Sequence, residues 1–461
     1  MIYTKEGAKA YEHSLDHALE FFSKAGSAFV GRKGFYDGEE SALSLFQKTW
    51  IVDPALSMKL LLWLRDIRGG AGNRSGAKEC YKWLAKNDPK WLEANIGWLP
   101  LVGRWDDLKS LFNTDAEKYA TELWAKALKD NDVLAAKWAD RNDAPLRKQL
   151  NMVIGDFRRF LAKIRKLHIV EHQMCTGQWN EIDYEKIPSV AMARYTKAFG
   201  KHDEERFNKY KESLVKGEAK VHADALFPHD CIRTSKNGDV EIADAQFYAL
   251  PNYMEGTDEK IMVVCDTSGS MDDIVAGSIK AVDVSQGIAL YCSARMPKDG
   301  PFYKKFIAFC SESELKDWED MTFSEAIRNK DIFDRAVGST HIHTALELIL
   351  RVAKTFELTE DQMPTTLMIV SDMQFHNGAI GNGSEIENCL KLYEKAGYEK
   401  PKVIYWNTSS YGGSPSTIKS PNTALVSGFN TGILKALLSG DDFTPKGVML
   451  RALEKYDITI P

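Results

Sequence analysis

The sequence predicts an α-helical first half followed by an α/β second half. Apolar residues recur at helical spacing through residues 1–215, and short connections favour antiparallel helix pairs stacked as in HEAT-type solenoids. From residue 260, short apolar runs alternate with helical stretches, which is typical of a mainly parallel sheet covered on both faces. Turn formers and acidic residues fill 216–259. We therefore expect two domains, at 1–215 and 260–461, joined by a crossover.

Helix-end signals divide the first half. Gly26 follows the first stretch as a stop signal, Pro54 opens the third, and Ser75 can cap the fourth, which Asp88-Pro89 ends. No fixed sequence period appears, so a strict repeat is not predicted. The predicted helices are 9–25, 41–50, 54–66, 75–86, 115–129 and 146–167.

Five apolar runs in the second half are too short for buried helices and fit the strands of a Rossmann-like sheet. Helical stretches between them supply the crossovers that parallel strands require. The predicted strands are 261–265, 305–310, 365–370, 402–406 and 423–426, and the predicted helices are about 275–293, 343–356, 384–396 and 431–439.

The most informative motif follows the first of these strands. Residues 266–270 read Asp-Thr-Ser-Gly-Ser, which places one carboxylate and two hydroxyls at the carboxyl end of a buried strand. Open α/β sheets bind their ligands at that edge. Hard oxygen ligands of this kind suit Mg²⁺.

Two further segments are expected at the same edge, and they extend the motif to five residues: Asp266, Ser268, Ser270, Thr340 and Asp372. This set resembles the metal-ion-dependent adhesion site of von Willebrand factor A domains. The resemblance implies bound Mg²⁺, or another divalent cation such as Mn²⁺ or Ca²⁺. Asp266 and Asp372 would hold the ion largely through water, and an open position would accept a partner's Asp or Glu. The alternative is an ordinary polar turn, or a site that stays empty.

Charge is unevenly distributed. Residues 1–257 carry 39 basic and 37 acidic residues, net +2, whereas 258–461 carry 21 and 28, net −7. Residues 59–90 hold eight basic and three acidic residues, and 146–167 hold seven basic residues beside Asp156. Such stretches are compatible with nucleic-acid contact, but a solvated helix face is the more common explanation. Any RNA is expected on the N-terminal half.

A second resemblance rests on residues 45–50 (LFQKTW), 62–74 (LWLRDIRGGAGNR), 99–108 (LPLVGRWDDL) and 186–193 (KIPSVAMA). They resemble a family known only as a domain of unknown function, similar in layout to the Ro autoantigen and its TROVE module. That layout implies a helical-repeat ring closed by a von Willebrand factor A domain, which binds structured or misfolded RNA as a ribonucleoprotein. Gly69, Gly70 and Gly72 fit a sharp interhelical turn, or a turn whose amides meet phosphate. The candidate RNA contacts are Arg68, Arg74, Lys78, Lys82, Arg158, Arg159, Lys163, Arg165 and Lys166.

Several classes are disfavoured. The first residues lack the apolar core of a signal peptide, no apolar run approaches a membrane span, and seven scattered cysteines favour reduced thiols. We expect a cytoplasmic protein. No Walker A loop, Gly-x-Ser-x-Gly elbow or His-Glu-x-x-His motif is present, so neither an enzyme nor a nucleotide cofactor is predicted. A metal-dependent hydrolase is the least favoured hypothesis.

Two functional hypotheses follow. The first is a Ro-like, non-catalytic RNA-binding protein with a Mg²⁺-dependent adhesion site for a protein or small acidic ligand. The second is a protein-interaction scaffold that binds a partner carboxylate through the metal and does not bind RNA.

Overall fold

The computed structural model describes residues 2–3, 9–10, 14–28, 40–166, 170–223, 226–276, 279–309, 312–332, 342–373, 375, 385–408, 415–418, 420–438 and 442–461. Fifteen helices of the described chain precede its main sheet. They are α1 (His17–Lys24), α2 (Ala42–Val52), α3 (Pro54–Arg65), α4 (Arg74–Asn87), α5 (Pro89–Asn95), α6 (Trp98–Val102), α7 (Glu117–Lys129), α8 (Val133–Trp138), α9 (Ala144–Gln149), α10 (Ile154–Arg165), α11 (Val170–Cys175), α12 (Ser189–His202), α13 (Glu204–Val215), α14 (Pro228–Lys236) and α15 (Val240–Tyr248).

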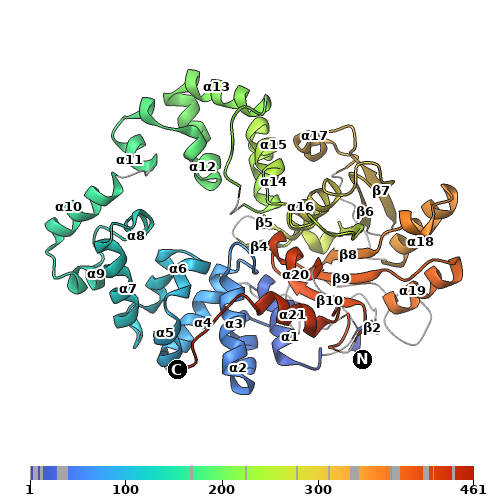
Figure 1. Cartoon of the computed structure of the whole chain (residues 1–461), viewed down its shortest axis with the longest axis horizontal. Helices are drawn as coiled ribbons and strands as arrows, with labels where there is room; N and C mark the ends of the chain where they lie inside the picture. The colour runs from blue at the N-terminus through green and yellow to red at the C-terminus, as the bar shows by residue number, and fades with distance from the viewer. Residues whose placement is uncertain are drawn as a thin grey trace.

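These helices follow an arc. In Figure 1 the chain runs from α2 and α3 through α5 and α7 to α10 at the left, and continues to α12 and α13 at the top. It then passes through α14 and α15, which lie beside the α/β part, and enters the sheet at Ile261. Both ends of the arc thus meet the α/β part. The predicted order, a helical first half and an α/β second half, is confirmed.

Local sequence sets the helix starts. Asp53 caps α3 by accepting a hydrogen bond from the Leu56 amide, and Pro54 occupies the first turn. Asn73, rather than the predicted Ser75, caps α4 by accepting from the Gly76 amide. The helix predicted over 9–25 begins only at His17, because Asp16 caps it there.

Six strands of the described chain form one sheet in the order β10-β9-β8-β3-β6-β7. All neighbours pair in parallel except β6 and β7. The strands are β3 (Ile261–Asp266), β6 (Lys305–Phe309), β7 (Ser313–Asp317), β8 (Thr366–Ser371), β9 (Lys402–Asn407) and β10 (Thr423–Ser427). Two small hairpins pair β1 (Ile2–Tyr3) with β2 (Lys9–Ala10) and β4 (Ile274–Ala276) with β5 (Ile279–Lys280). The accompanying helices are α16 (Ala281–Ser293), α17 (Phe323–Arg328), α18 (Ile342–Thr355), α19 (Glu385–Ala396), α20 (Leu434–Leu438) and α21 (Pro445–Leu453).

The five predicted strands are confirmed to within one residue at every end, and two other features differ from expectation. The edge strand β7 was not predicted, since its sequence SELKD is polar and half-exposed. The expected crossover at 216–259 contains α14 and α15, which pack on α16 and α17. The turn formers Asn237-Gly238 separate these two helices and do not mark a linker.

The N-terminal helix is docked on the last strand of the sheet. The Ser27 hydroxyl donates to the Asn407 carbonyl at 2.6 Å, and the Ser427 hydroxyl donates to the Phe22 carbonyl at 2.7 Å. The Gly26 amide donates to Ser427 Oγ at 3.0 Å. Any Cβ on Gly26 would overlap Ser427, so the close approach requires glycine there. One hydrophobic core accordingly runs from α1 and α3 into the sheet.

A second, smaller core lies in the far part of the arc. It is built on Tyr184, which lies between α11 and α12, on Phe199 of α12, and on Phe207 and Tyr210 of α13. Among the described residues, no helix combines the length and apolar character that crossing a bilayer would need.

Candidate functional site

The predicted metal motif lies at the carboxyl ends of the neighbouring parallel strands β3 and β8. β3 ends at Asp266 and β8 ends at Ser371, and the two strands are in register, with Cys265 beside Val370. The chain leaves β3 through α16 toward β6 on one side, and leaves β8 through α19 toward β9 on the other. This reversal is a topological switch point, the place where open α/β sheets form a ligand crevice.

Asp266 is fully buried and its orientation is fixed by hydrogen bonds. Oδ1 accepts from the Ser268 amide at 2.9 Å, and Oδ2 accepts from the Ser371 hydroxyl at 2.5 Å. The same Ser371 oxygen accepts from the Met373 amide at 3.0 Å. These contacts join the ends of β3 and β8 through a single carboxylate.

Two hydroxyls lie beside that carboxylate. Ser268 is buried and Ser270 is half-buried, and their Oγ atoms are 3.2 Å apart. A 3-10 turn, Gly269–Asp272, holds them together, and its Met271 is buried. Asp372, directly after β8, is 1% exposed. Its neighbour Met373 has a φ of +64°, a left-handed conformation that is uncommon for a side chain of this size.

Four of the five predicted metal residues are therefore described, from two adjacent strand ends. Thr340 lies outside the described residues. In the described part of the chain, no three or more His, Cys, Asp and Glu side chains converge as a metal-binding group. The donors at the sheet edge are carboxylates and hydroxyls, all of them oxygens, and this set fits Mg²⁺.

The first basic stretch has an internal role. The Arg65 guanidinium is buried and pairs with Asp107 at 2.7 Å, while Arg74 Nε donates to the other Asp107 oxygen at 2.9 Å. Lys78 lies 3.8 Å from that oxygen. Burial opposes ionisation of Asp107, but the charges of Arg65 and Arg74 outweigh it and hold its pKa below the ordinary value. Arg74 and Lys78 thus neutralise a buried carboxylate that the sequence reading overlooked.

The other residues of that stretch lie at the surface. Arg68 is exposed and donates to the Leu101 carbonyl at 3.0 Å. Lys82 pairs with Glu79 one turn away, at 2.9 Å. Both remain accessible to a ligand.

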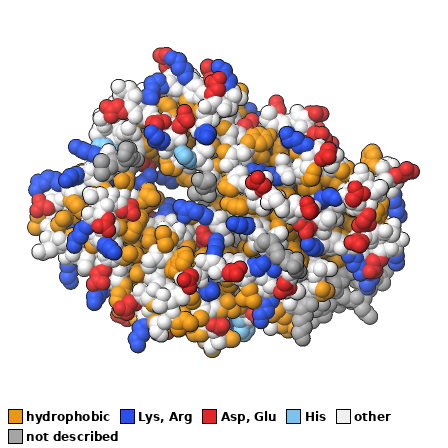
Figure 2. Space-filling view, viewed as in Figure 1, with side chains coloured by type: hydrophobic (Ala, Val, Ile, Leu, Met, Phe, Trp, Pro, Cys, Tyr) orange, Lys and Arg blue, Asp and Glu red, His pale blue; other side chains and the backbone are white. Residues whose placement is uncertain are grey.

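The second basic stretch forms one face of α10. Phe157, Leu161 and Ile164 are buried on the opposite face. Arg165 caps neighbouring carbonyls, those of Ala136 and Ala139. The exposed basic face of α10 comprises Arg158, Arg159, Lys163 and Lys166. Figure 2 shows Lys and Arg side chains gathered at this edge of the molecule.

Two arginines of this face have local partners. Arg158 donates to the Asn142 side chain at 2.6 Å, and Arg159 pairs with Asp156 at 2.5 Å. Arg159 is nevertheless 81% exposed. One acidic residue, Asp156, therefore lies among four exposed cations.

Comparisons with known proteins place the chain in a family. The family described as "Domain of unknown function (DUF2828)" matches residues 4–132 and 114–264, and "Domain of unknown function (DUF7788)" matches residues 260–455. A similar protein is the "Uncharacterized protein L728" of Acanthamoeba polyphaga mimivirus. It is 27% identical over 519 residues, covering 98% of this chain and 87% of that protein.

A similar solved structure is the Deinococcus radiodurans RO (RSR) protein. It matches with a TM-score of 0.47 and 14% identity, covering 96% of this chain and 100% of that one. The two DUF2828 matches together span residues 4–264, more than half of the 461 residues. The chain therefore belongs to the DUF2828 family of domains of unknown function.

Proposed function

We propose that this chain is a non-catalytic, Ro-like RNA-binding protein whose helical arc contacts the phosphate backbone. The exposed basic face of α10 carries the proposal, because four cations project from a helix anchored on its other side. Lys and Arg on such a face neutralise phosphates and release counterions. The arc that starts and ends against the α/β part is compatible with a closed ring.

Charge reversal on α10 tests this proposal. We expect the double substitution Arg158→Glu with Lys163→Glu to weaken binding of a structured RNA hairpin and to flatten its salt dependence. The measurement is fluorescence anisotropy between about 50 and 200 mM salt, a range over which phosphate contacts have a large effect.

The matched control reverses Lys126 and Lys129, which are exposed on α7. Equal losses in the two variants would show that net charge matters and α10 does not. An unmodified chain that fails to bind RNA at the lowest salt would exclude the proposal.

We further propose that the α/β part is a von Willebrand factor A-type domain that holds Mg²⁺ at the edge between β3 and β8. Ser268 and Ser270 would bind the ion directly, while the buried Asp266 and Asp372 would act through water. Thr340 would complete the set. When bound, the ion supplies an electrophilic position for a carboxylate. The fixed Asp266, the paired hydroxyls and the left-handed Met373 support this, since backbone strain is often found at functional sites.

Calorimetric titration with Mg²⁺ and paramagnetic resonance with Mn²⁺ test the metal site directly. The variant Ser268→Ala with Ser270→Ala removes two proposed ligands without touching the hydrogen bonds of the Asp266 side chain. We expect this variant to lose metal binding while retaining its circular dichroism spectrum. Undiminished Mn²⁺ binding would place the ion elsewhere.

This site also supports the second hypothesis, a scaffold that binds a partner carboxylate and no RNA. Two results together would favour the scaffold. The chain would bind no RNA, and its protein partner would fail to bind both in the presence of EDTA and in the variant Ser268→Ala with Ser270→Ala. RNA binding and carboxylate binding would use different parts of the molecule, so a chain with both activities would fit the first hypothesis.

A further inference from the structure

A cleft of about 570 Å³ lies between the loop after α3, the segment around Tyr253, and helices α20 and α21. Its size is that of a pocket for a small molecule. Four cationic side chains line it, from three separate segments: Arg68, Lys435, Arg451 and Lys455. Glu454 is the one acidic residue among its lining residues.

The cleft is rich in positive charge although the second half of the chain, which forms most of it, is acidic. Residues 258–461 have a net charge of −7, yet they contribute three of the four cations. Lys435 is exposed and forms no ion pair within the described residues. Positive charge that local carboxylates do not fully neutralise attracts an anion.

The floor of the cleft is built from small residues in close contact. A Cβ on Gly432 would overlap the Arg68 carbonyl, and a Cβ on Gly69 would overlap the Lys455 ammonium group. Larger side chains at either position would displace one of the lining cations. The two glycines thus keep the Arg68 loop against α20.

The walls are held by a buried carboxylate. Asp66 Oδ2 accepts from Lys455 at 2.5 Å and from the Tyr456 hydroxyl at 2.8 Å, and Oδ1 accepts from the Arg68 amide at 2.8 Å. Burial disfavours ionisation of Asp66, but Lys455 and these hydrogen bonds hold its pKa below the ordinary value. The loop that carries Arg68 and the end of α21 are therefore fixed relative to each other.

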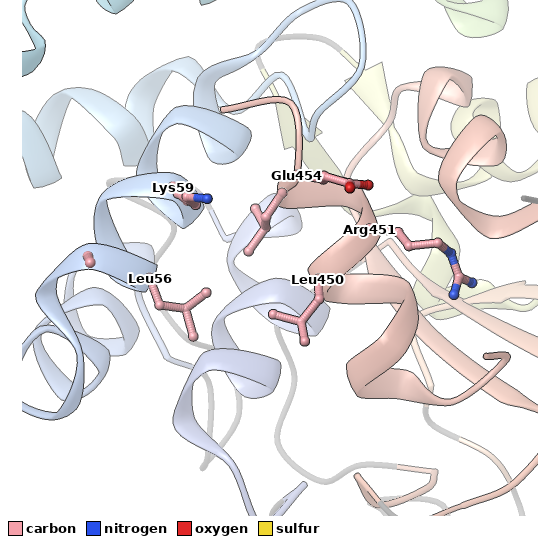
Figure 3. Close-up of a pocket in the computed structure, with 7 residues that line it drawn as sticks. Leu56, Lys59, Leu450, Arg451 and Glu454 are labelled. Atoms are coloured by element: carbon pink, nitrogen blue, oxygen red, sulfur yellow. The ribbon is translucent and has the colours of Figure 1, made fainter. Parts of the chain in front are cut away.

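The two sides of α21 differ in character. Figure 3 shows Leu56 and Leu450 facing one another across a groove between α3 and α21, while Arg451 points away from them. Arg451 donates through Nε to the Ala436 carbonyl of α20, so its guanidinium lies on the side of the basic cleft. The groove and the basic cleft thus lie on two sides of α21 and share Arg451 and Glu454 as lining residues.

We propose that this cleft binds the phosphate group of a nucleoside monophosphate, either free or as the phosphorylated end of an RNA strand. Arg68 and Lys435 would contact the phosphate, and the half-buried Tyr253 would form one wall. A site for a free nucleotide would be an addition to the sequence-based expectation, which includes no nucleotide cofactor. The inference does not require the basic face of α10 to bind RNA.

The test compares two RNA octamers that carry the same 3′ dye and differ only at the 5′ end, phosphate or hydroxyl. We expect the phosphorylated octamer to bind about tenfold more tightly, the effect of one charge-assisted contact. Adenosine monophosphate is the second probe, followed by phosphorus NMR line broadening. Tighter binding of the phosphorylated octamer without broadening of the adenosine monophosphate signal assigns the cleft to RNA ends. Broadening of the monophosphate signal assigns it to free nucleotides.

The substitution Arg68→Glu with Lys435→Glu should abolish both signals, while Lys446→Glu, on the exposed surface of α21 outside the cleft, should leave them unchanged. The single substitution Lys435→Ala should weaken both signals. It shows whether a loss in the double variant reflects the cleft or misfolding, because a single exposed substitution usually leaves the fold intact. Equal binding of the two octamers together with an unbroadened monophosphate signal would overturn the inference. Hairpin binding that is unchanged in the α10 variant, with the phosphate preference intact, would instead count against the proposed function and leave this inference standing.

Discussion

Two basic stretches of the helical part have opposite roles. Around α4, Arg65, Arg74 and Lys78 surround the buried Asp107, so their charge is used inside the protein. On α10, Arg158 and Lys163 face solvent above an apolar anchor. In the sequence the two stretches look alike. A high count of Lys and Arg therefore indicates a nucleic-acid surface only when those side chains are not already paired with buried carboxylates.

The largest expected effect comes from breaking the buried pair. Arg65→Ala removes the partner 2.7 Å from Asp107 and leaves that carboxylate buried with less compensation. We expect a loss of about 3–5 kcal/mol in the free energy of unfolding, measured by urea denaturation. Arg159→Ala on α10 is the control, since exposed pairs contribute less than about 1 kcal/mol. Similar losses in both variants would remove the distinction between the two stretches.

The second largest expected effect is that acid lowers the stability that the ion pairs of Asp107 with Arg65 and Arg74 provide. The pKa of Asp107 is lower in the folded state than in the unfolded state. Its contribution to the free energy of unfolding is therefore fully present above the unfolded-state pKa of about 3.9, and it is lost as the pH falls through the folded-state pKa. We expect the stability advantage of the unmodified chain over Asp107→Asn to be constant near neutral pH and to shrink below about pH 4. An advantage that grows in acid would contradict this assignment.

The smallest effect on stability is expected at α10. The double variant Arg158→Glu with Lys163→Glu should change the free energy of unfolding by no more than about 0.5 kcal/mol, as is usual for surface substitutions. Thermal unfolding followed by circular dichroism measures this. A large loss would mean that the basic face of α10 supports the fold, and any loss of RNA binding would then need a second explanation.

The sequence predicts the sheet better than the site. The apolar runs that became β3, β8 and β9 are fully or nearly fully buried, so composition alone identifies them. The polar edge strand β7 lacks that signal. Asn73 caps α4 in place of the predicted Ser75, and its side chain also donates to the carbonyls of Ala25 and Ala28, two contacts that no local pattern reveals.

The candidate metal residues illustrate the same limit. Asp266, Ser268 and Ser270 could be predicted together, because a strand end and a short spacing define them. The pairing of Asp266 with Ser371 depends on two strands more than a hundred residues apart being neighbours. Asp107 is opposite Arg65 for a similar reason, across 42 residues. Such pairs are brought together by the order of strands and helices in the fold, which local sequence patterns do not determine.

The docking of α1 on β10 has a consequence for how the chain folds. The hydrogen bonds of Gly26 and Ser27 with Ser427 and Gly428 join residues 401 positions apart. During synthesis α1 is made about 400 residues before β10, the strand on which it docks. Contacts between such distant residues slow folding and leave apolar surface exposed in the meantime. The buried face of α1, with Phe21 and Phe22, is thus a segment that a ribosome-associated chaperone would be expected to shield until β10 has been made.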